Sequence, residues 1–116
     1  MRRENAYLRD ILQAIDRSSQ FIDGMTKDDF LADEKTQAAV ARQIEVVGEA
    51  ASRLPESFRS EHSSVPWQEL IQLRNFYIHA YHAIDYSRAW RSATVTLPSI
   101  RNGVQAILDM SVSGKS

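Results

Sequence analysis

The stretch VARQIEVVGEAASRL, residues 40–54, carries the strongest structural signal in this chain. Its apolar side chains recur at intervals of four, three, four and three residues: Val40, Ile44, Val47, Ala51 and Leu54. This spacing places them along one side of an α-helix and is typical of a seam in a helix bundle. We expect the helix to begin after Asp33, a residue type that caps helices, and to end at Leu54 before Pro55.

The chain before this segment also has a helical pattern. Apolar residues at helical spacing predict a first helix over about residues 5–23, which Gly24 would stop. The sequence Thr26-Lys27-Asp28-Asp29 then resembles a capping box, the arrangement that opens a helix by satisfying its first amide groups. We therefore expect a short helical turn between the two long helices.

The chain after this segment predicts two more helices. Residues 56–64 are polar and are expected to be partly irregular. Pro66 is placed for the first turn of a third helix, which should run over about residues 67–78. A fourth helix should begin near Asp85, and Pro98, which lacks an amide hydrogen, should kink or split it before it ends near residue 110.

The expected fold class is all-α, an antiparallel bundle of four main helices in one domain over residues 1–116, with an ordered core over about 5–110. No stretch shows the strict alternation of a half-buried β-strand. The length of 116 residues suits one domain. A hydrophobic content of 43% is enough to build a core, so disorder is not expected.

The composition excludes several functional classes. The chain contains no cysteine, which removes disulfides, thiolate zinc sites and cysteine nucleophiles. No apolar run is long enough to cross a membrane, and Arg2 and Arg3 precede Glu4 and Asn5 instead of an apolar export signal. We therefore expect a cytoplasmic protein.

The charge distribution favours the second half of the chain for anion binding. A net charge of −1 argues against a purely electrostatic nucleic-acid binder. Residues 1–66 carry nine basic and twelve acidic side chains, whereas residues 67–116 carry five basic and three acidic ones. The second half of the chain therefore carries a net charge of +2 and the first half a net charge of −3.

Arg74 stands where the pattern of the third helix asks for an apolar residue. The predicted stripe consists of Trp67, Leu70, Ile71, Arg74 and Ile78. A guanidinium group cannot lose its charge, so its burial requires a partner. That partner could be a carboxylate such as Glu45 or Glu49, a subunit boundary, or an anionic ligand.

The residues that follow Arg74 could form a pocket. If the chain becomes extended after the third helix, His79 and Tyr81 would share one side and meet Arg74 and Asn75 there. The alternatives are a histidine that caps the helix end and a packed tyrosine ring. His79 and His82 have a spacing that could bind a metal ion, but no cysteine or helical His-Glu frame supports this, so we expect no metal and no cofactor.

Arg74, His79 and Tyr81 form the pattern Arg-x4-His-x-Tyr, with Asn75 directly after the arginine. This pattern resembles the signature of the HepT-like toxins in the HEPN superfamily. Three further landmarks occur in the same order as in that family: Ile44–Ala50, Pro66-Trp67, and Asp85 with Trp90. The resemblance covers about residues 5–110. Ala80 departs from it, since many relatives are expected to carry an acidic residue there.

The resemblance implies a metal-independent endoribonuclease that cleaves RNA through attack by the 2′-hydroxyl group. The assigned catalytic residues are Arg74 and His79. His79 could transfer protons near neutral pH, and Arg74 could stabilise the charge that develops on the phosphate. Asn75 would position the phosphate or the histidine. A homodimer would bring two such motifs into one cleft, because one histidine per subunit is sparse for both acid and base.

The resemblance also implies a partner protein. HepT-like toxins pair with small nucleotidyltransferase antitoxins of the MNT type, in type VII-like systems, and these antitoxins transfer AMP to the motif tyrosine. Tyr81 would be that AMPylation site.

Two other interpretations of the sequence remain. The first alternative is a non-catalytic HEPN module that binds a nucleotide or a partner protein, and a third interpretation is a plain helical interaction protein. Tyr86 and Trp90 could stack on bases or pack in the core, and Arg88 and Arg91 could contact RNA or remain solvated.

Overall fold

All regular elements in residues 3–79 and 84–112, the part of the chain that the computed structural model describes, are helical. They are α1 (Arg3–Phe21), α2 (Lys27–Leu31), α3 (Glu34–Arg53), α4 (Glu56–Glu61), α5 (Trp67–His79), α6 (Tyr86–Arg91), the π-helical segment η1 (Ser92–Thr96) and α7 (Leu97–Val112). None of the described helices combines the length and the apolar character that a lipid bilayer crossing requires.

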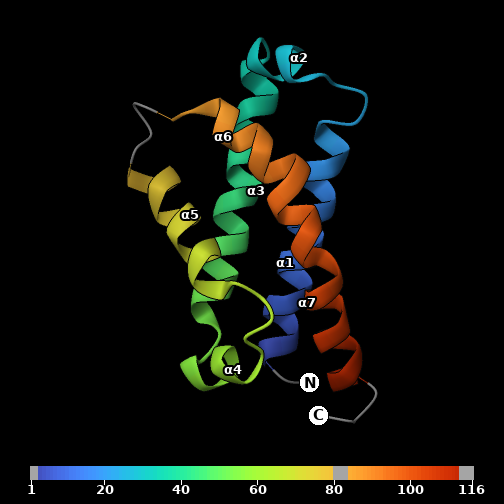
Figure 1. The fold of residues 1–116 in the computed structure, drawn as a ribbon, viewed down its shortest axis with the longest axis vertical. Helices are drawn as coiled ribbons and strands as arrows, with labels where there is room; N and C mark the ends of the chain where they lie inside the picture. Colours follow the sequence, from blue (N-terminus) through green and yellow to red (C-terminus); the bar gives the residue numbers. More distant parts are fainter. Residues whose placement is uncertain (1–2, 80–83, 113–116) are drawn as a thin grey trace.

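Helix α3 is the centre of the bundle. Figure 1 shows it, in green, running between α1 and α5, and its most extensive contacts are with these two helices. Helix α7 packs on the other side of α1. The seam that the sequence predicts along α3 is buried at each of its five positions: Val40, Ile44, Val47, Ala51 and Leu54. The predicted antiparallel helix bundle is therefore confirmed.

The predicted helix boundaries are confirmed where side chains cap them. Thr26 and Asp29 form the reciprocal pair of a capping box at α2, with amide-to-oxygen distances of 3.0 and 3.1 Å. The Asp33 carboxylate accepts the amide hydrogen of Thr36 at the start of α3, and Asp85 caps α6 in the same way. These bonds satisfy amide groups that have no partner inside the helix.

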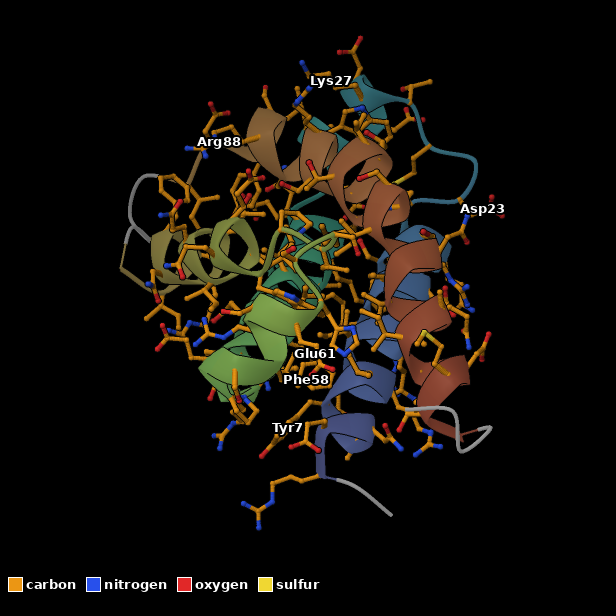
Figure 2. The ribbon with its side chains drawn as sticks, turned by 60° about the horizontal axis from the view of Figure 1, so that its bottom comes forward. Tyr7, Asp23, Lys27, Phe58, Glu61 and Arg88 are labelled. Atoms are coloured by element: carbon orange, nitrogen blue, oxygen red, sulfur yellow. The ribbon has the colours of Figure 1, made fainter. Side chains whose placement is uncertain are left out.

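The segment after α3 is more regular than its sequence indicates. Residues 56–61 form the short helix α4, although a partly irregular stretch was expected over 56–64. Phe58 of α4 packs against the Trp67 ring, at 6.4 Å between ring centroids, and the Trp67 indole donates a hydrogen bond to the His62 carbonyl oxygen. Figure 2 shows Phe58 and Glu61 of α4 at the same end of the bundle as Tyr7 of α1.

The last helix is kinked but not split. Helix α6 continues through η1 into α7 without a break, and at the end of η1 the amide of Leu97, the first residue of α7, donates to the Ser92 carbonyl five residues earlier. This wider turn directly precedes Pro98, which has no amide hydrogen to donate. Tyr86 and Trp90 of α6 pack against Phe30, with ring centroids 6.5 and 5.4 Å apart, so their role is in the core.

The predicted apolar stripe of α5 is right at its start and wrong at its end. Trp67, Leu70 and Ile71 are buried, but Ile78 is 44% exposed. Tyr77 is buried in its place, with 3% of its surface exposed, and burial raises the pKa of its hydroxyl to about 12. The buried face has therefore turned by one residue after Arg74.

Candidate active site

A glycine brings the backbones of α3 and α5 together beside Arg74. A β-carbon placed on Gly48 would overlap the β-carbon of Arg74 and would lie 2.7 Å from the Leu70 carbonyl oxygen. Only a glycine leaves room for this approach. The close contact fixes the start of the Arg74 side chain against α3, directly beside Glu49.

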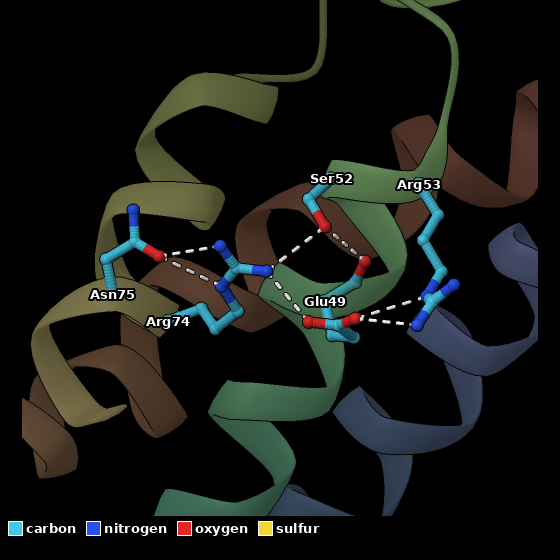
Figure 3. Close-up of polar contacts among 5 residues, drawn as sticks. All are labelled: Glu49, Ser52, Arg53, Arg74 and Asn75. Atoms are coloured by element: carbon cyan, nitrogen blue, oxygen red, sulfur yellow. Dashed lines mark hydrogen bonds and ion pairs between the residues drawn. The ribbon is translucent and has the colours of Figure 1, made fainter. Parts of the chain in front are cut away.

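Arg74 spans the two helices with its guanidinium group (Figure 3). Its Nη1 donates to Glu49 Oε2 at 2.7 Å and to Ser52 Oγ at 3.2 Å. The Arg74 side chain is 19% exposed and the Glu49 side chain is 46% exposed, so the arginine is shielded from water and the carboxylate is half open to it. The carboxylate partner that the misplaced arginine required is therefore Glu49, and not Glu45.

The other edge of the guanidinium group faces Asn75. The amide oxygen Oδ1 of Asn75 accepts hydrogen bonds from Arg74 Nε at 3.0 Å and from Nη2 at 2.6 Å (Figure 3). This fork of two N–H groups is the edge with which arginine binds carboxylates and phosphates. A neutral and exposed side chain occupies it here.

Glu49 is shared between two arginines. Its Oε1 contacts Arg53 at 2.9 Å, while its Oε2 contacts Arg74. The hydrogen bond from Arg74 is the main cause that lowers the pKa of the Glu49 carboxyl, and the charges of both arginines act in the same direction. The carboxylate thus stays ionised and holds Arg74 in place.

The structure brings Arg74 and Asn75 together, whereas other residues of the predicted site lie outside the part of the chain that it describes. Helix α5 ends at His79, five residues after Arg74, and the side chain of His79 lies outside the described part of the chain. Ala80, Tyr81 and His82 also lie outside the described residues. The two roles assigned to His79 and Tyr81 therefore stay predictions.

Two members of the cluster were not singled out by the sequence. Ser52 accepts from Arg74 and donates to the Glu49 carbonyl oxygen at 2.7 Å, one turn back along α3. Its position three residues after Glu49 is the only sequence signal that could have indicated it. Gly48 precedes Glu49, and a glycine inside a long helical pattern is a sign of close backbone approach.

Arg88 makes a separate contact on the opposite side of α5. Its guanidinium carbon lies 4.7 Å from the centre of the Phe76 ring, which is a cation–π contact. Phe76 is two residues after Arg74, so it points to another face of the helix. Arg88 is therefore not part of the cluster around Arg74.

Comparison with known proteins identifies relatives of the whole bundle. A family model described as "Ribonuclease HepT-like" matches residues 11–107. The chain is 38% identical over 95 residues to a protein of Thermococcus cleftensis named "Probable ribonuclease HepT", which covers 82% of this chain and 86% of that protein. It is 39% identical over 103 residues to a protein of Methanocaldococcus jannaschii named as a "Putative RNase", covering 89% of this chain and 85% of that protein. A further protein with that type of name, from Caldanaerobacter subterraneus subsp. tengcongensis, is 33% identical over 108 residues, covering 93% of this chain and 96% of the relative. No solved structure matches the chain.

Proposed function

Because this chain belongs to the HepT-like ribonuclease family, we propose that it is an endoribonuclease that cleaves RNA by 2′-hydroxyl attack and without a metal ion. The proposal rests on the hydrogen-bond partners of the Arg74 guanidinium group. One end of its guanidinium group is fixed by Glu49 and Ser52, and among the described residues its fork is bound by the neutral Asn75 amide alone. An arginine held in this way is prepared to receive an anion.

The first step is exchange at the fork of Arg74. A phosphate oxygen takes the place of Asn75 Oδ1, because a hydrogen bond between two charged groups is stronger than one to a neutral amide. The amide of Asn75 is then free to donate its own hydrogens to the phosphate. Glu49 stays bound to Nη1 throughout and keeps the guanidinium group in position.

The chemical step needs proton transfer. RNA supplies its own nucleophile, since its 2′-hydroxyl oxygen can attack the adjacent phosphorus, form a 2′,3′-cyclic phosphate and release the 5′-oxygen of the next nucleotide. His79 takes the proton from the 2′-hydroxyl or gives one to the leaving oxygen. Arg74 stabilises the extra negative charge that the phosphate carries in the transition state.

Two subunits supply both proton-transfer groups in this proposal. Each chain has one motif histidine, so a homodimer that places two motifs at one cleft provides an acid and a base. DNA resists the reaction because it lacks the 2′-hydroxyl group.

We further propose that this ribonuclease is the toxin of a HEPN/MNT toxin–antitoxin pair. The nucleotidyltransferase partner transfers AMP from ATP to the Tyr81 hydroxyl and releases pyrophosphate. Tyr81 follows Arg74 by seven residues in the family motif. The added nucleotide brings bulk and negative charge that compete with RNA for the arginine, which silences the toxin.

Cleavage of RNA in the presence of EDTA tests the ribonuclease proposal. The unmodified protein should cut RNA, leave 2′,3′-cyclic phosphate ends and spare DNA of the same sequence. Arg74→Ala and His79→Ala should abolish cleavage, whereas Arg17→Ala, which removes an exposed arginine of α1 away from the cluster, should not. A protein whose intact mass shows no added AMP and which still leaves RNA uncut would overturn the proposal in favour of a binding module.

A further inference from the structure

A hollow lies beside the Arg74 cluster, between α1 and α3. Its volume is about 220 Å³. It is lined by Tyr7 and Asp10 of α1 and by Arg42, Val46, Glu49 and Arg53 of α3. Glu49 and Arg53 therefore belong both to this hollow and to the cluster that holds Arg74. Figure 3 shows Arg53 on the side of Glu49 that faces α1, drawn in blue, and Arg74 on the side that faces α5.

The hollow combines an apolar wall with polar groups at its rim. Tyr7 and Val46 are partly buried and pack against the core, so they present a firm apolar surface. Asp10 and Arg42 are exposed, and neither forms an ion pair with the described residues. Their hydrogen-bonding groups are available to a ligand that lies on the apolar wall.

The charge of Glu49 does not prevent a nucleic acid from approaching. Each of its two carboxylate oxygens contacts an arginine, at 2.7 Å for Arg74 and 2.9 Å for Arg53. The two guanidinium groups flank one carboxylate and together exceed its charge by one unit. This local excess of positive charge favours a strand whose phosphate lies at Arg74 and whose next nucleotide extends past Arg53 toward the hollow.

We propose that this hollow is a subsite for the base of a nucleotide next to the cleaved phosphate. The proposal rests on the proposed ribonuclease function and extends it to substrate preference. A base lies against Tyr7 and Val46, as bases do on aromatic and apolar walls. Asp10 can only accept hydrogen bonds when ionised, and Arg42 can only donate them.

Guanine matches this pair of rim groups best. Its O6 and N7 atoms accept from an arginine fork, which is the commonest specific contact to that base. Its N1–H and amino group can donate to a carboxylate. Uracil offers one such donor, and adenine lacks the O6 acceptor. The subsite should therefore favour guanine.

Single-ribonucleotide substrates measure this preference directly. DNA strands that carry one ribose allow cleavage at one position only, and the bases on either side of that phosphate are varied through all four. Guanine at one of the two positions should raise kcat/KM by about tenfold over uracil. Arg42→Gln and Asp10→Asn should reduce this ratio to about twofold, while the melting temperature stays that of the parent. Arg17→Gln, which removes an exposed positive charge elsewhere on α1, should leave the ratio unchanged.

Failure of the subsite and failure of the ribonuclease proposal give different results. Cleavage with equal rates for all bases, or a preference that survives both substitutions, overturns the subsite and leaves the ribonuclease intact. If the unmodified parent cleaves nothing, its binding of 2′-O-methyl RNA tests whether the hollow is a base subsite. Base-dependent affinity that Arg42→Gln removes supports the hollow as a base site, and affinity that does not depend on the base or on Arg42 overturns it.

Discussion

Arg74 and Arg101 each form an ion pair with a carboxylate of a neighbouring helix, and the two ion pairs are equally short. Arg101 of α7 binds Asp16 of α1 at 2.7 Å, and Arg74 of α5 binds Glu49 of α3 at 2.7 Å. Arg101 uses its fork, with Nε on one oxygen of Asp16 and Nη2 on the other at 3.0 Å. Both oxygens of the Asp16 carboxylate are thereby bound to the same guanidinium group.

Arg74 is bound through its other end. Nη1 contacts Glu49, and the fork is left to the neutral amide of Asn75. Two ion pairs of the same length can therefore differ in which edge of the guanidinium group the carboxylate occupies. In the first, the fork is taken by a fixed charge. In the second, the charge positions the arginine and the fork remains exchangeable.

The largest expected effect comes from a variant that keeps the charge of Arg74 and removes its fork. Arg74→Lys retains one positive charge but has no planar pair of N–H groups. We expect kcat/KM for RNA cleavage to fall by about 100-fold, which corresponds to about 2.7 kcal/mol. Arg101→Lys should change it by no more than about twofold. Equal losses in the two variants, measured on proteins of equal folded fraction, would show that the forks are not used differently.

A second variant tests the close contact between α3 and α5 at Gly48, which positions Arg74 but not Arg101. Gly48→Ala places a methyl group against the backbone of α5, so the helices must separate, and the free energy of unfolding should fall by about 2 kcal/mol. Gly103→Ala in α7 is the matched control, because its β-carbon would lie 3.3 Å from a single methyl group of Val65. Urea denaturation should show no loss of stability for the control, because alanine is favoured over glycine inside a helix by about 1 kcal/mol.

A third variant fills the fork of Arg74 with a charge. Asn75→Asp makes the second pair resemble the first, because a carboxylate then occupies the Nε and Nη2 edge. The KM for RNA should rise about tenfold, or about 1.4 kcal/mol. Asn102→Asp adds the same charge on an exposed position of α7 and should leave KM within about twofold. An unchanged KM in Asn75→Asp would mean that RNA does not use this edge.

The smallest expected effect concerns the pH dependence of the Arg101–Asp16 pair. The hydrogen bond from Arg101 lowers the pKa of the Asp16 carboxyl in the folded protein. Its stabilisation is therefore present above the ordinary carboxyl pKa of about 4 and is lost as the pH falls through the lower folded value. The pair is partly exposed, so Asp16→Asn should cost only about 0.5 kcal/mol at pH 7 and nothing in strong acid. Unfolding followed from pH 7 to pH 2 should therefore show the stability difference between Asp16→Asn and the parent shrinking to zero, and a difference that persists at pH 2 would contradict this prediction.

The sequence predicted the parts of the fold that depend on neighbouring residues. Thr26, Asp33 and Asp85 cap helices by bonds within three residues, and the seam of α3 follows helical spacing, so each could be recognised locally. Ile78 was misplaced because helical spacing alone cannot say how a stripe turns around a charged residue. Residues 56–61 were missed as a helix because a six-residue polar helix has no apolar stripe.

The candidate site was only partly predictable for a similar reason. The misplaced Arg74 could be recognised, and its carboxylate could be narrowed to Glu45 or Glu49, but the choice depends on how α3 and α5 are set together by Gly48. Adjacent residues on a helix do not normally face one another, so nothing in the spacing indicated that Asn75 would occupy the fork of Arg74. The first fact depends on packing between two helices, and the second depends on the side-chain conformations of two adjacent residues in α5.

The position of α7 beside α1 has a consequence for how the chain could be rearranged. The start of α1 and the end of α7 lie at the same end of the bundle (Figure 1). A short peptide linker could join them, and new termini could be opened in the turn at residues 22–25, at the opposite end of α1. Such a circular permutant would keep α3, α4 and α5 in their present order along the chain. The order in which the ribosome delivers the helices would then change while the Glu49–Arg74 contact is retained.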